Sequence, residues 1–140
     1  TGWQAGATQE GSIQRLRYTG KTGIYLTKAK ARKNRLQLTF TEPVKPDSVT
    51  RESFSASAWN YKWSKGYGSP QLKASDPETR GIDELAIDSL ELSDDGLTLT
   101  VQIPELIPCH NLKLDFAVTG KNGSALSGPV YFTIHELPES

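Results

Sequence analysis

The sequence predicts an all-β fold, an antiparallel β-sandwich of about seven to nine strands that carries one long surface insertion. Three observations lead to this class. Short segments alternate apolar and polar residues, turn-forming residues separate these segments, and no stretch keeps a helical period over three turns. Strands with one apolar face bury those faces against each other as packed sheets. A chain of 140 residues is long enough for one such domain with a single core.

The N-terminal region is expected to contribute one or two strands, in the segments SIQRLRYTG and GIYLT. We assign residues 1–33 to this region and interpret it as the exit from an upstream domain. The sandwich itself is predicted for residues 34–140.

Four later segments have the two-residue period of half-buried strands. They are NRLQLTFTE, LTLTVQI, NLKLDFAV and VYFTI. Their predicted inward residues are Leu36, Leu38 and Phe40; Leu97, Leu99, Val101 and Ile103; Leu112, Leu114, Phe116 and Val118; and Val130, Phe132 and Ile134.

Two dipeptides mark tight connections between neighbouring antiparallel strands. Asp95-Gly96 lies between LAIDSLEL and LTLTVQI, and Asn122-Gly123 precedes the last strand. Both dipeptides tolerate the positive φ that short hairpin turns need. The segment EPVKPDSVTRESF predicts one helical turn between strands, with Val49 and Phe54 closing the core.

The segment from Trp63 to Asp83 is long, polar and rich in Gly, Pro, Ser and charged residues. Such a segment does not belong to a minimal sandwich, so we predict an insertion at about 63–83 that lies over the surface.

The segments LQLTFTEPVKPDSVTRESFS, LELSDDGLTLTVQIPEL and GKNGSALSG resemble bacterial immunoglobulin-like modules of the surface-layer type. The resemblance covers Asn34 to Leu137. It implies an Ig-like or fibronectin-like antiparallel sandwich, which here is longer than those modules, chiefly through the insertion.

Three further segments, GSIQRLRYTGK, WNYKWSKGYGSP and TIHEL, are similar to a C-terminal region of large exported bacterial proteins. Those proteins also carry a quinoprotein-dehydrogenase-like propeller and a c-type cytochrome domain. The resemblance implies an exported protein, periplasmic, secreted or at the cell surface. Its partners would be neighbouring domains of the same polypeptide. It assigns no activity to this domain, because the redox centres of such proteins lie on other domains.

No catalytic residues, metal ligands or cofactors are predicted. Covalent haem requires Cys-x-x-Cys-His, and LIPCH supplies only Cys109 and His110, with Leu106 at the first cysteine position. At a strand start these two neighbours would point to opposite faces, which does not suit a shared metal ion. Asp76, Glu78 and Asp83 offer oxygen ligands for calcium, but their spacing matches no known calcium loop.

The overall charge favours neither nucleic acid nor membrane insertion. Sixteen basic and sixteen acidic residues balance, and the apolar runs are far shorter than the roughly 20 residues that span a bilayer. The charges are nevertheless segregated: residues 15–35 carry only basic ionisable side chains, and residues 76–95 are acidic apart from Arg80. Either the two segments attract each other, or the basic one docks on an acidic neighbouring domain. The docking residues would be Arg15, Arg17, Lys28, Lys30 and Arg32.

An aromatic cluster is the remaining candidate site. Trp59, Tyr61 and Trp63 occupy alternate positions, and Tyr67 follows. Alternation places them opposite the inward face of FSASA, so they stand on the outer face unless a bulge at Ala58-Trp59 turns them inward. Three interpretations remain: the insertion covers the rings, a neighbouring domain docks on them, or sugars stack against them.

We therefore expect a non-catalytic accessory or interaction domain that packs on or spaces the enzymatic domains of an exported multidomain bacterial protein. The alternative is a carbohydrate-binding module that uses the aromatic cluster and binds polysaccharide. An enzyme in its own right is the third and least supported class.

Overall fold

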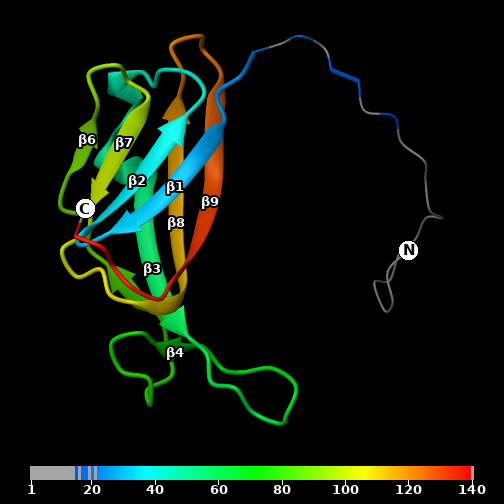
Figure 1. Cartoon of the computed structure of the whole chain (residues 1–140), viewed down its shortest axis with the longest axis vertical. Coiled ribbons are helices and arrows are strands. Elements are labelled where there is room, and N and C mark those ends of the chain that lie inside the picture. The colour runs from blue at the N-terminus through cyan, green and yellow to red at the C-terminus, as the bar shows by residue number, and fades with distance from the viewer. Residues whose placement is uncertain (1–14, 16, 19, 21, 140) are drawn as a thin grey trace.

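The computed structural model describes residues 15, 17, 18, 20 and 22–139, and it is a sandwich of two antiparallel sheets (Figure 1). The first sheet has the order β1-β2-β7-β6, with β1 Leu26–Arg32, β2 Arg35–Phe40, β7 Thr98–Gln102 and β6 Leu90–Leu92. The second has the order β4-β3-β8-β9, with β4 Leu72–Lys73, β3 Phe54–Asn60, β8 Cys109–Thr119 and β9 Ala125–Ile134. Strand β5, Asp83–Leu85, also pairs with β3.

The strand order matches that of immunoglobulin constant-type domains. Strands β1, β2, β7 and β6 take the positions of the A, B, E and D strands, and β3, β8 and β9 take those of C, F and G. The all-β antiparallel sandwich predicted from the sequence is thus confirmed.

The core lies between the two sheets and contains most of the residues predicted to point inward. Leu97 is an exception, because it precedes β7 and is only half-buried. Six leucine and valine side chains from both sheets are fully buried: Leu36, Leu38, Leu99, Val101, Leu112 and Leu114. The ring of Phe116 on β8 lies 6.3 Å from that of Phe40 on β2 and 6.4 Å from that of Phe54 on β3. This contact joins the two sheets because Phe40 and Phe116 come from opposite layers.

Strand β1 is the edge of the first sheet and forms a hairpin with β2. The predicted boundary between residues 33 and 34 falls in the turn of this hairpin, where Asn34 has a φ of 60°. The segment SIQRLRYTG lies largely outside the described residues, and its described members are not in a strand. Within the described residues, the N-terminal region contributes strand β1, which is part of the sandwich.

The connections agree with the expected turn chemistry. Gly96 and Gly123 have φ values of 73° and 84° in the β6–β7 and β8–β9 turns. The predicted helical turn is a pair of short 3-10 segments, η1 Pro46–Ser48 and η2 Arg51–Ser53. Phe54, which follows η2, is buried, whereas Val49 is half-buried.

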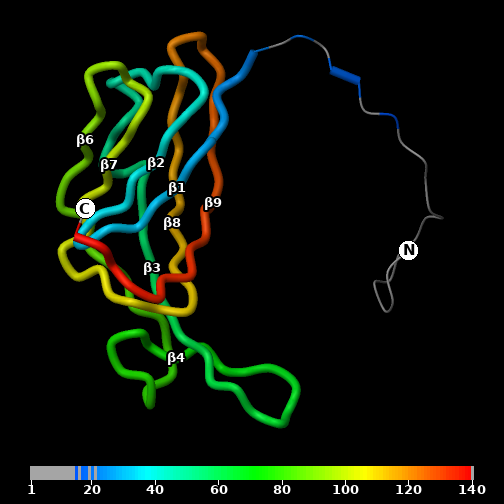
Figure 2. Tube along the Cα trace, in the orientation of Figure 1, coloured from blue at the N-terminus to red at the C-terminus, as the bar shows by residue number. Residues whose placement is uncertain are grey.

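The insertion forms two loops that project beyond one end of the sandwich (Figure 2). The first loop covers residues 61–71 and the second 74–82. Strand β4 lies between the two loops and pairs with Trp59 and Asn60 of β3. Strand β5 follows the second loop and pairs with residues 56–58 of β3. The insertion therefore extends the edge of the second sheet in addition to adding loops, and Leu72 and Ala74 anchor it by being buried.

Candidate functional site

The outer position of Trp59 follows from the regular pairing of β3. Every residue of β3 from Phe54 to Trp59 has a partner on β8 without a register shift, and Trp59 pairs with Asn111. Ala58 points into the core and is 1% exposed, so the next side chain points outward. The pairing therefore shows no bulge at Ala58-Trp59, and Trp59 stands on the outer face of the sheet.

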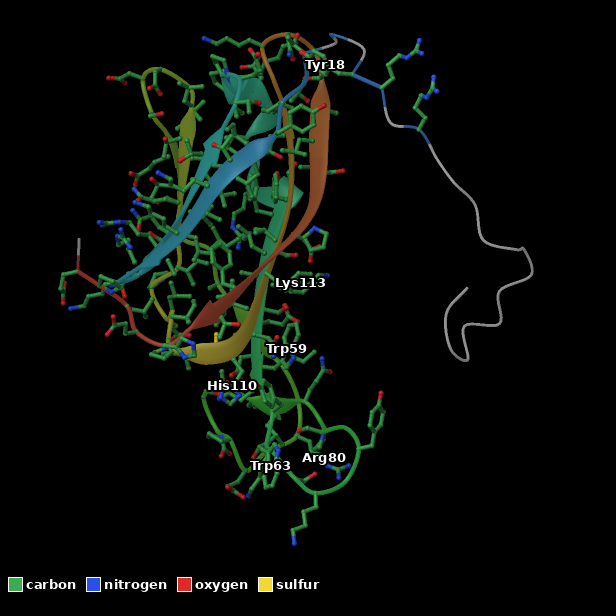
Figure 3. The ribbon with its side chains drawn as sticks, turned by 45° about the vertical axis from the view of Figure 1, so that its right-hand side comes forward. Tyr18, Trp59, Trp63, Arg80, His110 and Lys113 are labelled. Atoms are coloured by element: carbon green, nitrogen blue, oxygen red, sulfur yellow. The ribbon has the colours of Figure 1, made fainter. Side chains whose placement is uncertain are left out.

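Beyond Asn60 the chain leaves the sheet and presents its aromatic side chains to solvent. Tyr61 is 53% exposed and Trp63 82%, while Tyr67 is fully exposed. In Figure 3, Trp63 lies at the far end of the molecule, beyond Trp59 and His110. The insertion therefore does not cover the aromatic cluster in the part of the chain that the structure describes.

These rings line an open groove of about 530 Å³, which we call the aromatic groove. Its walls combine aromatic surface with polar and small side chains: Trp59, Tyr61, Lys62, Trp63, Ser64, Gly66, Tyr67, Gly68, Ser69 and Asn111. Lys62 is the charged residue among them. Such a surface can stack flat apolar groups and donate hydrogen bonds at their edges.

Two hydrogen bonds join the end of β3 to the start of β8 beside the aromatic groove. The backbone N–H of Tyr61 donates to Nδ1 of His110 at 3.1 Å, and the backbone N–H of His110 donates to Oδ1 of Asn60 at 2.8 Å. The Tyr61 and His110 rings also pack, with centroids 4.3 Å apart. Across the first loop, the backbone N–H of Lys62 donates to Oγ of Ser69 at 2.9 Å.

Sequence reasoning found the four aromatic residues but missed Asn111, Ser69 and His110 as their neighbours. Asn111 reaches the groove because it pairs with Trp59, and His110 packs on the ring of Tyr61 outside the groove. No local pattern in the sequence predicts which residue of β8 lies opposite Trp59. Of the polar residues expected behind the rings, Lys62 lines the groove. Asn60 instead accepts the hydrogen bond from His110.

Asp76 in the second loop and Asp83 in β5 accept hydrogen bonds from residues of the second loop. Asp76 accepts hydrogen bonds from the hydroxyl of Thr79 and the backbone N–H of Glu78. Partial burial acts to raise the pKa of Asp83, but hydrogen bonds from the backbone N–H and hydroxyl of Ser75 outweigh it and lower that pKa. Across the described residues, no group of three His, Cys, Asp or Glu side chains could hold a metal ion.

Cys109 and His110 point to opposite sides, as their positions in a strand predict. Cys109 is 4% exposed and belongs to the core, whereas His110 is exposed. Burial raises the pKa of the Cys109 thiol to about 11. The neutral thiol is thus a small core residue, and a thiolate ligand or nucleophile at this position is disfavoured.

The residues expected to dock a neighbouring domain lie at one edge of the first sheet. Lys28 and Lys30 are exposed and Arg32 is half-buried on β1, while Arg15 and Arg17 are exposed outside any strand. Within the described range, the three ion pairs are Lys33–Glu139, Lys62–Glu78 and Lys113–Asp115. None joins the basic segment 15–35 to the acidic segment 76–95, so the attraction considered between these segments does not take the form of ion pairs.

Comparison with known proteins supports the fold. Two solved structures of the S-layer protein SbsC are similar: rSbsC(31-844), with a TM-score of 0.54 and 19% identity, and SbsC domains 1-6, with a TM-score of 0.51 and 16% identity. Each match covers 80% of this chain but only 14% of the S-layer chain. CopC from Methylosinus trichosporium OB3b aligns over 81% of this chain and 96% of its own, at 18% identity and a TM-score of 0.46.

No protein-family model and no curated protein matches the sequence. The likeness to the S-layer domains is therefore a likeness of fold. Among the described residues, none of the helical segments is long and apolar enough to cross a membrane.

Proposed function

We propose that this domain is a non-catalytic interaction module of an exported multidomain protein, and that it packs against neighbouring domains of the same polypeptide. The observation that carries the proposal is the unpaired basic strip on the edge strand β1. Lys28, Lys30 and Arg32 alternate on one side of the strand and form no ion pair within the described chain. An edge strand is accessible from the side, so an acidic neighbour can approach it.

The fold is compatible with this role. The similar SbsC structures belong to S-layer proteins, and one of them comprises six domains. A sandwich of this kind places its two sheet edges and its end loops at the surface, where neighbouring domains can contact them. The export of the protein is part of the proposal and rests on the family resemblance.

Zero-length crosslinking of the intact parent protein tests the proposal. A carbodiimide joins lysine amines to carboxylates that touch them, so Lys28 and Lys30 are expected to link to acidic residues of another domain. Lys65, in the first loop of the insertion, is the control for unspecific coupling. If Lys28 and Lys30 form no more interdomain links than Lys65 does, the proposal is wrong.

The second candidate function is carbohydrate binding in the aromatic groove. The observation that favours it is the combination of exposed rings with polar neighbours, since Trp63 and Tyr61 lie beside Asn111, Ser69 and Lys62. Aromatic rings stack on the apolar faces of sugars while polar groups bond their hydroxyls.

Affinity electrophoresis of the domain in gels that contain single polysaccharides tests this candidate. Binding would slow the wild type, and Trp63→Ala would restore the mobility seen without polysaccharide. Tyr131→Ala is the matched control, because Tyr131 is also exposed, at 59%, but lies on β9 and does not line the groove. Unchanged mobility of the wild type in every gel would exclude the candidate for the glycans used.

A further inference from the structure

The first sheet carries basic side chains at one edge and acidic side chains at the other. Lys30 on β1 pairs with Gln37 on β2, Gln37 pairs with Thr100 on β7, and Thr100 pairs with Glu91 on β6. These four residues form one row across the outer face, because the neighbouring leucine and valine residues point inward. The row therefore has basic Lys30 at the β1 edge and acidic Glu91 at the β6 edge.

The same polarity holds along both edges. On the β1 edge, Lys28 and Lys30 are exposed. On the opposite edge, the exposed acidic residues are Asp88, Glu91, Asp94 and Asp95, which precede β6, lie on it, or follow it in the β6–β7 turn. The basic and acidic residues that are separated along the sequence are therefore also separated in space, because the strand order places β1 and β6 at opposite edges of the sheet.

The two edges are too far apart to neutralise each other within one molecule. Three strand spacings of about 4.8 Å separate Lys30 from Glu91, which amounts to roughly 14 Å. This distance exceeds the screening length of about 8 Å at physiological ionic strength. The opposite edge therefore does not cancel the electrostatic field of either edge, and each edge can attract a partner of opposite charge.

Opposite charges lie near both edges, but no ion pair among the described residues joins them to the exposed charges of the edges. At the β1 edge, Glu139 pairs with Lys33 in the hairpin turn, and Glu136 lines a groove with Ala29 and Ala31 without an ion pair to Lys28 or Lys30. Beside the β6 edge, Arg51 keeps its positive charge and donates to the carbonyl oxygens of Ile87 and Phe54, and it forms no ion pair with the acids of that edge. Lysines on an edge strand by themselves only discourage strand pairing, whereas an acidic opposite edge supplies a matching surface.

We propose that two copies of this domain associate edge to edge, with the β1 edge of one copy against the β6 edge of the next. The contact is heterologous: a basic surface meets a different, acidic surface, so a pair of copies still has one free basic edge and one free acidic edge. Repetition of the contact therefore produces a row of copies. The inference rests on the same basic strip as the first proposed function, but it takes a second copy of the domain as the acidic partner.

Sedimentation velocity of the whole chain tests the inference. At about 20 mM salt the screening length is about 20 Å, and at about 0.5 M it is about 4 Å. We expect the weight-average sedimentation coefficient to rise with protein concentration at low salt and to return to the monomer value at high salt. A wild type that stays monomeric at low salt up to millimolar concentration would overturn the inference.

Two charge-reversed variants then identify the edges. In Lys28→Glu/Lys30→Glu the two exposed lysines of the β1 edge become acids, and in Asp88→Lys/Glu91→Lys/Asp94→Lys three of the four exposed acids of the β6 edge become bases, so each variant alone should lose association. An equimolar mixture of the two should associate again, because the acidic edges of one variant face the basic edges of the other. All five positions are exposed, so these variants are expected to keep the fold.

The matched control is Lys65→Glu/Lys121→Glu, which changes the net charge as much as the first variant does. Lys65 lies in the insertion and Lys121 in the β8–β9 turn, and neither belongs to β1 or β6. The control should associate as the wild type does. If it also loses association, or if the mixture fails to restore it, net charge and not edge pairing is responsible and the inference fails. Interdomain crosslinks of Lys28 and Lys30 in the parent protein would still support the first proposed function.

Discussion

The backbone N–H of Tyr61 donates a hydrogen bond to Nδ1 of His110 across 3.1 Å, and the two rings pack with centroids 4.3 Å apart. Tyr61 is the first residue after β3, and His110 is the second residue of β8. This pair therefore ties the beginning of the exposed loop 61–71 to the rigid second sheet, and it sets the direction in which the loop leaves the sandwich.

The first prediction concerns this tie. His110→Ala should raise hydrogen exchange of the backbone N–H groups of residues 61–69, because the acceptor of the Tyr61 N–H is lost. The global free energy of unfolding should fall by only about 1 kcal/mol, since His110 is exposed. His135→Ala is the control, because His135 is also exposed but forms no hydrogen bond with this loop. Faster exchange in both variants would contradict a specific role for His110.

The second prediction concerns alkaline pH. Burial raises the pKa of Cys109 from an ordinary 9.0 to about 11, so the folded state retains the thiol proton at pH values where the unfolded state has lost it. This contribution to stability is complete below pH 9, and it is lost as the pH rises from about 9 to about 11. Urea unfolding from pH 8 to 11 should show a decline that is smaller in Cys109→Ala. An equal decline in the two proteins would count against it.

The third prediction separates the two described tryptophans. Trp63 is 82% exposed, whereas Trp59 is half-buried on the outer face of the sheet. In a Trp3→Phe background, acrylamide should quench fluorescence more steeply in Trp59→Phe, which retains Trp63, than in Trp63→Phe, which retains Trp59. Trp63→Ala should change the free energy of unfolding by less than about 0.5 kcal/mol. Strong shielding of Trp63 in the isolated domain would mean that the insertion covers the ring after all.

The fourth prediction compares two turn glycines. Gly96 and Gly123 both have positive φ, where an alanine costs about 1–2 kcal/mol. A Cβ on Gly96 would also meet Cβ of Pro43 at 3.1 Å and the carbonyl oxygen of Val44 at 3.4 Å, while one on Gly123 would meet nothing within 4 Å. Thermal unfolding should therefore show a larger loss for Gly96→Ala than for Gly123→Ala. Equal losses would show that backbone conformation alone decides the cost.

The local patterns identified the strands and turns well, because they depend on neighbours in sequence. The alternation of Leu36, Leu38 and Phe40 required one buried face, and that face is buried. The predicted insertion at about 63–83 contains β4 and the first residue of β5, since strands of two or three residues show no period in the sequence. Their pairing with β3 depends on a partner that is distant in the sequence.

The sequence by itself determined an antiparallel sandwich, its main strands and its tight turns, because side-chain period and positive φ are local properties. Alternation from Ala58 left either an outer face or a bulge for Trp59, and the regular pairing of β3 decides for the outer face. Only the tertiary structure decided that the rings beyond Trp59 remain exposed and that Asn111 and His110 join them. It also decided that basic β1 and acidic β6 occupy opposite edges of one sheet. These last facts depend on which strands pair, and pairing is set by the burial of all apolar faces at once.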